Sequence, residues 1–296
     1  MPPSSSEAPV PDCAPPKEIA RQPSYAMPEG AWDVHFHVLG PWRKFPYARD
    51  RAFTPHDVPK EKILAVHRQL GIGRGVAVQP SLYGTDHGTL LDLLAAGAGR
   101  YRGVIGIEWG IDEKLVEALH AKGIRGVRLS LSHGRSMPPL DPIRRTADLI
   151  GPRGWHLDFH GDSVGEGRLK ALLSLGLPIV IDHMSRYSWR VDHPRGVDQA
   201  PFRELLDARR NERFWIKLSC ADRISKVGAP FDDVVPYARA LVDSAPDRVV
   251  WGTDYPNTNH PNVPDCADLV DAIPLFAPDP AVRQGILVDN PARLYG

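Results

Sequence analysis

The sequence has few cysteines, no excess of charge of either sign and no long apolar run. Its 296 residues include three cysteines without a CxxC pair, so no disulfide framework is expected and a cytoplasmic location is favoured. Lysine plus arginine equals aspartate plus glutamate at 36 each, which argues against a nucleic-acid partner. No apolar stretch approaches the roughly 18 residues of a membrane span, and the first residues do not resemble a signal peptide.

The composition that is present is that of a globular protein, with 42% hydrophobic and 24% charged residues. Residues 1–30 are rich in proline and serine and are expected to form an extended or partly disordered arm. Residues 31–296 are long enough for one α/β barrel domain. The chain therefore divides into an arm and a single predicted domain.

Eight runs typical of strands begin near residues 32, 75, 103, 125, 155, 178, 213 and 248. Between most of them lie helical patterns, at 61–71, 112–122, 165–175, 202–210, 234–244 and 267–273. This alternation predicts parallel βαβ units, and eight units close a (β/α)8 TIM barrel. A doubly wound open sheet is the competing interpretation, but no glycine-rich phosphate loop follows the first run.

Histidines and one aspartate stand where these runs end. They are His35, His37, His160, His183 and Asp254. Strand ends of a parallel barrel meet at one mouth, where the catalytic groups of such barrels lie. Residues two apart on a strand share a face, so His35 and His37 are both expected to point inward. The five side chains suit either a metal ion or the activation of water at a carbonyl.

Six short motifs follow one another along the chain. They are His35-x-His37, Gln79-Pro80-Ser81, Gly126-Val127-Arg128, Ile181-Asp182-His183-Met184-x-Arg186, Cys220-x-Asp222-Arg223 and Gly252-Thr253-Asp254-Tyr255-Pro256. Each motif alone is weak, but their order is specific. Together they resemble the amidohydrolase superfamily, and within it the lactonase branch that contains the 2-pyrone-4,6-dicarboxylate lactonases.

The resemblance implies a role for each matching position. Asp254 takes a proton from the attacking water, while His35, His37 and His183 polarise the lactone carbonyl without a metal. The resemblance also implies that carboxylates of the substrate bind at cationic and hydrogen-bonding side chains. Arginine suits this task because its guanidinium can donate two parallel hydrogen bonds to one carboxylate. The residues predicted to bind the substrate are Ser81, Arg128, Arg186, Arg223, His160 and Asn257.

Two of these positions are among the places where the chain departs from the lactonase pattern. His160 stands where those enzymes carry a tyrosine, and Asn257 stands where they carry a histidine. Because metal-dependent members of the superfamily use histidines of this kind with the last aspartate, one Zn²⁺ or Mn²⁺ remains an open alternative. Its ligands would be His35, His37, His160 and Asp254.

The sequence thus predicts a hydrolase that opens a small, carboxylate-bearing lactone. A sugar-acid lactone hydrolase or isomerase, and a mononuclear-metal decarboxylase of an aromatic acid, are the alternatives among enzymes. A ligand-binding barrel without activity is the alternative outside them. We expect a monomer or a small homo-oligomer, with no nucleic-acid or membrane partner.

Overall fold

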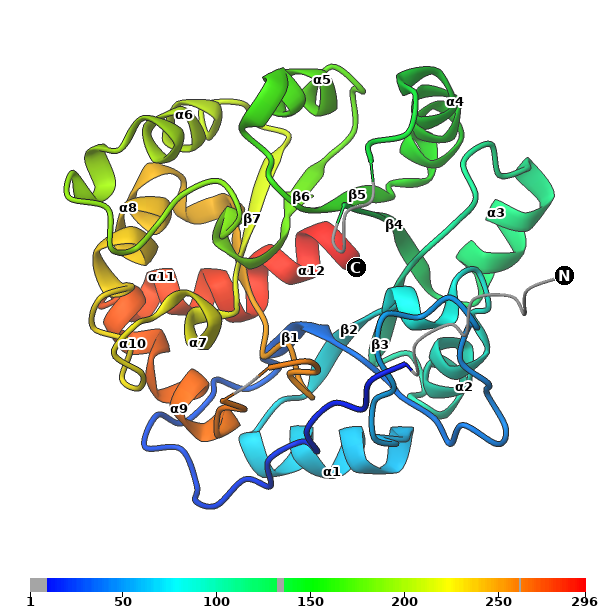
Figure 1. The fold of residues 1–296 in the computed structure, drawn as a ribbon, viewed down its shortest axis with the longest axis horizontal. Helices are drawn as coiled ribbons and strands as arrows, with labels where there is room; N and C mark the ends of the chain where they lie inside the picture. Colours follow the sequence, from blue (N-terminus) through cyan, green and yellow to red (C-terminus); the bar gives the residue numbers. More distant parts are fainter. Residues whose placement is uncertain (1–9, 132–135, 261) are drawn as a thin grey trace, which may run out of the picture.

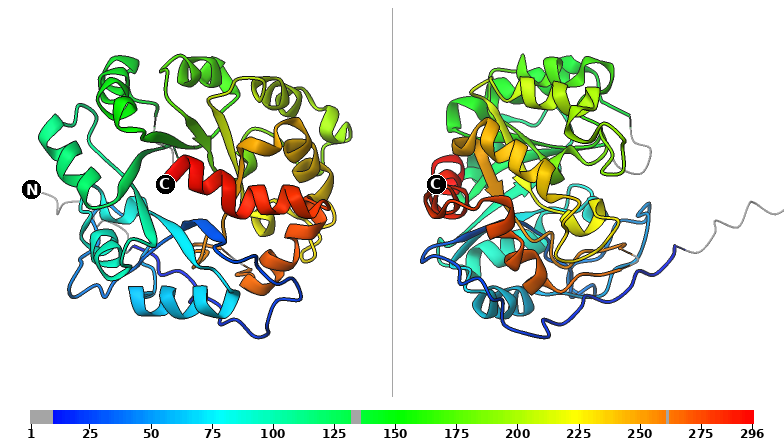
Figure 2. Two further views of the ribbon diagram at one scale, coloured as in Figure 1. Left: turned by 180° about the vertical axis from the view of Figure 1, so that it is seen from behind. Right: turned by 90° about the vertical axis from the view of Figure 1, so that its left-hand side faces the viewer.

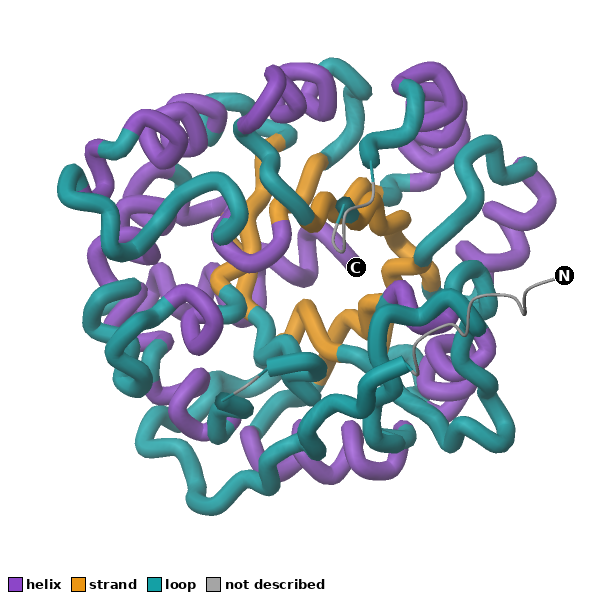
Figure 3. Tube along the Cα trace, in the orientation of Figure 1, coloured by secondary structure: helices purple, strands orange, loops and turns teal. Residues whose placement is uncertain are grey.

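The computed structural model describes residues 10–131, 136–260 and 262–296. Within them, eight parallel strands pair in chain order around a barrel (Figures 1 and 3), which confirms the predicted (β/α)8 fold. The strands are β1 Trp32–Phe36, β2 Arg74–Val78, β3 Tyr101–Ile105, β4 Ile124–Ser130, β5 His156–His160, β6 Ile179–Ile181, β7 Phe214–Leu218 and β8 Val249–Trp251.

Helices form a ring outside the strands, as Figure 3 shows. The α-helices are α1 Lys60–Leu70, α2 Gly88–Ala96, α3 Glu113–Ala121, α4 Leu140–Ile150, α5 Arg168–Leu173, α6 Ala200–Ala208, α7 Ala221–Ile224, α8 Val235–Ser244, α9 Cys266–Asp271, α10 Ile273–Phe276, α11 Pro280–Gln284 and α12 Asn290–Tyr295. Six of them match the predicted patterns. The helix expected at 165–175 is shorter, because a 3₁₀ turn with Glu166 at φ 58° precedes α5. Helices α2, α4, α7, α10, α11 and α12 were not predicted.

The inner side of the barrel carries its own apolar cluster. Side chains from β1, β2, β3, β6, β7 and β8 meet Leu294 and Tyr295 of α12 there. Helix α12 lies across the back of the barrel in Figure 2, so it closes the end opposite the strand carboxyl ends. The ring of Tyr295 stacks on Trp32 at 6.3 Å and meets His156 edge-on at 5.0 Å.

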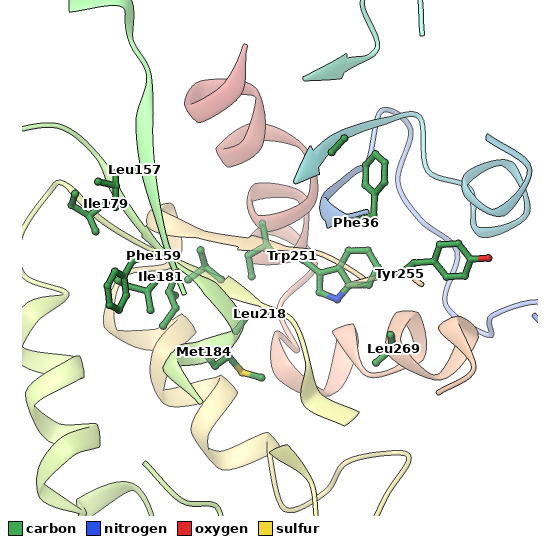
Figure 4. Packing of buried hydrophobic residues seen from close by; sticks show 14 of the residues in the cluster. Phe36, Leu157, Phe159, Ile179, Ile181, Met184, Leu218, Trp251, Tyr255 and Leu269 are labelled. Atoms are coloured by element: carbon green, nitrogen blue, oxygen red, sulfur yellow. The ribbon is translucent and has the colours of Figure 1, made fainter. Parts of the chain in front are cut away.

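The outward faces of the strands pack against the surrounding helices. Phe159, Ile181 and Leu218 lie close together on this side, and Trp251 lies next to Phe36 and Tyr255 in the same view (Figure 4). All six belong to one continuous buried cluster. Because the strands are covered on both sides, they are apolar on both faces, as is typical of parallel sheets.

The seam between β1 and β8 completes the barrel beyond the end of β8. The amide of Asp254 donates to the carbonyl of His35 at 2.8 Å, and the amide of His37 donates to Tyr255 at 2.8 Å. The Asp33 carboxylate accepts from both the amide and the hydroxyl of Thr253. This seam holds the last aspartate beside the first two histidines.

The described part of the N-terminal arm, residues 10–30, lies along the barrel. Arg21 pairs with Asp268 and Asp271 of the α9 segment at 2.6 Å each, and Asp12 forms an isolated bridge with Thr54. Residues 1–9, on which the prediction of partial disorder also falls, lie outside the described residues. No helix in the described ranges is long and apolar enough to cross a membrane.

Candidate active site

A cavity of about 310 Å³ opens at the carboxyl ends of the strands. Eight of the predicted site residues line it, together with Tyr187, Cys220, Thr258 and Asn259. The eight are His37, Ser81, Arg128, His160, His183, Arg186, Arg223 and Asp254. His35 is fully buried beneath them. Asn257 is not among the lining residues: its amide nitrogen donates to the carbonyl of Thr253 at 3.1 Å.

Asp254 lies at the floor of this cavity, between imidazoles on one side and a thiol and a guanidinium on the other. Its Oδ1 is 3.4 Å from His37 Nε2 and 3.6 Å from His35 Nε2. Its Oδ2 accepts from Cys220 Sγ at 3.1 Å and lies 3.5 Å from Arg223 Nε. Burial raises the pKa of the Asp254 carboxyl, but His183, His37 and Arg223 outweigh burial and hold this pKa well below its usual range. Asp254 is therefore a carboxylate at neutral pH.

Three lining residues have left-handed backbones directly after their strands. The φ angles are 54° at His183, 59° at Cys220 and 58° at Asp254. A left-handed conformation costs an L-residue roughly 1–2 kcal/mol, and such strain collects at functional sites. At these positions the turn bends the chain sharply where the strand ends, so the side chain lines the cavity.

Cys220 links His183 to Asp254. The Sγ of Cys220 lies 3.1 Å from His183 Nδ1, which also contacts Ser219 Oγ at 2.8 Å. Burial, with the nearby Asp254 charge, raises the pKa of the Cys220 thiol well above its usual range. Cys220 is thus a protonated donor to Asp254 rather than a nucleophile. The motif containing Cys220 was recognised in the sequence, but the contact of its thiol with Asp254 was not predicted.

Arg128 lines the cavity and also forms a buried ion pair. Its Nε and Nη2 donate to Asp182 Oδ2 at 3.1 and 2.9 Å. A second cavity of about 270 Å³ shares Pro80, Ser81, Arg128 and Ser130 with the first. The predicted substrate-binding arginine therefore stands between two adjoining cavities, with part of its guanidinium engaged by Asp182.

Arg186 and Arg223 differ in how much of each guanidinium is already engaged. Arg223 donates to the carbonyls of Thr258 and Asn259 at 2.7 and 3.3 Å, which fixes it against the loop after β8. Arg186 lies over the Tyr187 ring, 4.1 Å from its centroid. The buried Nε of Arg186 has no hydrogen-bond partner among the described residues. The Nη2 of Arg186 donates to the Tyr187 hydroxyl, and the unpartnered Nε gives Arg186 donor capacity to offer an anion.

His160, the position that departs from the lactonase pattern, lies at the end of β5. Its Nδ1 contacts Ser130 Oγ at 3.1 Å, and its ring meets His183 and Tyr187 edge-on at 5.1 and 5.3 Å. Burial, with the Arg128 charge, lowers the pKa of His160 well below its usual range. His160 is accordingly a neutral imidazole in the cavity wall.

A fully buried charged network lies under the cavity and was missed from the sequence. Lys217 forms a short ion pair with Asp158, lies 3.0 Å from Asp182 Oδ1 and 3.4 Å from His35 Nδ1. The side chains of Lys217, Asp158 and Asp182 are all inaccessible to solvent. Because Lys217 stands inside the apolar run Phe214–Leu218, a charged residue on a central strand was the signal that could have revealed the network.

The hydrogen bonds of the ring nitrogens decide which imidazoles fit a metal ion. Ligand atoms of His35, His183 and Asp254 lie within 4.8 Å of one another. This group shares His35 and Asp254 with the predicted ligand set and adds His183. His37 Nδ1 donates to the Val78 carbonyl at 2.7 Å, and its Nε2 lies 3.4 Å from Asp254 Oδ1. His35 Nδ1 faces the Lys217 ammonium, which can only donate. A ring that accepts a hydrogen bond at Nδ1 has no lone pair on Nε2 to offer a metal ion.

The fold and the site define a (β/α)8-barrel protein with a buried carboxylate, neutral imidazoles and arginines at its mouth. The amidohydrolase family model matches residues 32–296, and the chain belongs to this family. It is 39% identical to a 4-sulfomuconolactone hydrolase of Rhizobium radiobacter over 99% of this chain and 98% of that protein. It is 36% identical to a 2-pyrone-4,6-dicarboxylate hydrolase of Comamonas testosteroni, covering 93% and 92% of the two chains.

A solved structure has the same architecture. A Pseudomonas putida protein, provisionally named a 2-pyrone-4,6-dicarboxylic acid hydrolase, superposes with a TM-score of 0.79 at 31% identity. The alignment covers 91% of this chain and 98% of that one. The likeness therefore extends over the barrel and its mouth.

Proposed function

We propose that this protein hydrolyses a small anionic lactone, with Asp254 as the general base. The observation that carries the proposal is the ionised Asp254 carboxylate, which lies at the floor of a cavity that also contains three arginines. The names of the two curated relatives, both hydrolases of anionic lactones, support the same reaction class.

In the proposed reaction, water attacks the lactone carbonyl as Asp254 accepts one of its protons. The tetrahedral intermediate then breaks its ring C–O bond, and the proton passes from Asp254 to the leaving oxygen, giving an open-chain acid. Because the low pKa of Asp254 makes it a weak base, attack depends on polarisation of the carbonyl. His37 and His183 line the cavity beside Asp254 and are assigned to the developing oxyanion.

Anion recognition is assigned to the arginines. Arg186 has an unengaged buried donor, and Arg223 and Arg128 place further positive charge around the same cavity. Ser81 and His160 lie in the wall between them and are assigned hydrogen bonds to the substrate. A substrate with one or two carboxylate or sulfonate groups fits this charge distribution.

A lactone panel tests the proposal. Pyrone dicarboxylates, sulfomuconolactone, muconolactones and aldarolactones are incubated with the wild type and with Asp254→Asn. General bases contribute about 10²–10⁴-fold to rate, so the variant should lose at least about a hundredfold in kcat while still binding substrate. Asp192→Asn, at an exposed aspartate, is the control. Near-normal turnover by Asp254→Asn would refute the assignment.

The product and the chelator distinguish the remaining reaction classes. NMR of the product separates hydrolysis from movement of the ester between hydroxyls, which an isomerase would give. We propose no step through a metal ion, so activity should survive treatment with a chelator. Activity lost with chelator and restored by Zn²⁺ or Mn²⁺ would instead favour a metal-dependent enzyme.

A further inference from the structure

We propose that buried Lys217 fixes His35 as the tautomer that carries its proton on Nε2, so that His35 directs an N–H toward Asp254 and is not a metal ligand. The contacts of His35 and His37 would then fix a proton on opposite ring nitrogens, Nε2 in His35 and Nδ1 in His37. The inference deepens the proposed function, because it concerns how the assigned base is held, but its main tests do not need a known substrate.

The first step is the environment of Lys217. Its ammonium lies between the carboxylates of Asp158 and Asp182, and a buried ammonium needs such partners to remain charged. Each carboxylate has a further cationic or imidazole neighbour: Arg128 beside Asp182 and His156 beside Asp158. The network is therefore a compact array of paired charges directly under His35.

The second step is the direction of the hydrogen bond to His35. Lys217 Nζ lies 3.4 Å from His35 Nδ1, and an ammonium has three donors and no acceptor. Asp158 accepts one of these donors, and Asp182 Oδ1 lies near the ammonium as an ion-pair partner, so a donor remains for His35 Nδ1. Asp182 Oδ1 also lies 3.3 Å from this nitrogen, but it is nearer to the ammonium, at 3.0 Å. A neutral His35 that accepts at Nδ1 carries its proton on Nε2.

The third step is what each tautomer presents to Asp254. His35 Nε2 has no hydrogen-bond partner among the described residues and lies 3.6 Å from Asp254 Oδ1. An N–H at this position attracts the carboxylate, whereas a lone pair would repel it. His37 instead has the proton of its Nδ1 fixed by the Val78 carbonyl. Lys217 acts through His35 and is a positioning residue, as the cavity does not reach it.

The direct test is the protonation of the rings in the wild-type protein. Long-range ¹H–¹⁵N spectra of ¹⁵N-histidine-labelled protein distinguish the two neutral tautomers, and His35→Gln and His37→Gln identify the signals that disappear. The inference expects the proton on Nε2 in His35 and on Nδ1 in His37. A proton on Nδ1 of His35 would overturn it.

The second test uses a charge-balanced variant, Lys217→Met with Asp158→Asn, with exposed Lys170→Met as the control. Without the ammonium, His35 can donate from Nδ1 to Asp182 and present a lone pair beside Asp254. Zn²⁺ alone, measured by calorimetry, should bind the double variant at least about tenfold more tightly than the wild type or the control. Equal zinc affinities in all three proteins would overturn the inference.

Where a lactone substrate is found, kinetics add a third readout. The double variant should lose about tenfold to a hundredfold in kcat with little change in KM, the range expected for losing one charge-assisted contact at the base. Failure of every lactone would overturn the proposed function while leaving the tautomer and zinc results intact. If the double variant does not fold, the wild-type spectra alone decide the tautomer.

Discussion

Acidification from pH 7.5 to pH 5.5 should destabilise this protein through its buried imidazoles. Burial lowers the pKa of both His160 and His183 well below the ordinary value. In the unfolded chain each imidazole has a pKa of about 6.5. Below that pH the unfolded state binds more protons than the folded state, so stability falls with falling pH. At pH 5.5 each ring that stays neutral in the folded state lowers the free energy of unfolding by about 1.4 kcal/mol. The two rings together lower it by about 3 kcal/mol.

Urea unfolding followed by circular dichroism at the two pH values measures this loss. His160→Gln removes one of the two rings and should reduce the loss by about 1.4 kcal/mol. The matched control is His56→Gln at an exposed imidazole, which should keep the full loss. The lowered pKa values of Asp182 and Asp254 do not affect stability between pH 5.5 and pH 7.5. The stability that such carboxylates contribute is lost only below their pKa in the unfolded chain, which is about 4. An equal loss in His160→Gln and wild type would refute the reasoning.

Three further variants test other parts of the structure. Arg186→Met should raise KM for an anionic lactone at least about tenfold, and an equal rise for a neutral lactone would contradict carboxylate recognition. Arg209→Met removes a buried guanidinium that donates to four backbone carbonyls and should lower the free energy of unfolding by about 3–5 kcal/mol; a loss under about 1 kcal/mol would oppose this. Gly252→Ala places a Cβ 2.7 Å from the amide nitrogen of His35 and should abolish folding or activity, while the uncrowded Gly151→Ala tolerates the methyl group.

The order of strands and the meeting of their ends could be predicted, because both follow from local patterns. Apolar runs alternating with helical segments predict a parallel barrel, and parallel strands bring their carboxyl ends to one mouth. The strand pattern alone therefore predicted one common site for His37, His160, His183 and Asp254. Helices α2 and α4 were missed, since recognising the strand order did not require them.

The depth of each side chain in the site could not be predicted from alternation. A β-bulge between Asp33 and Phe36 shifts the register of β1 against β2, so Asp33 contacts His67 of α1 instead of sharing the inner face with His35. His35 lies under the cavity and His37 lies in its wall. Asn257 does not line the cavity for a similar reason: its backbone is left-handed at φ 55°, and its side-chain amide donates to the carbonyl of Thr253. Bulges and left-handed turns depend on contacts across the barrel, which no sequence period records.

The seam between β1 and β8 explains how the strained turn at Asp254 is retained. The left-handed backbone of Asp254 costs roughly 1–2 kcal/mol, and its amide is fixed by the carbonyl of His35. One residue earlier, Thr253 is bound through both its amide and its hydroxyl to buried Asp33. These hydrogen bonds join the two strands that close the barrel, so the turn cannot relax without opening the seam. The geometry of the proposed base is therefore maintained by the same contacts that complete the fold.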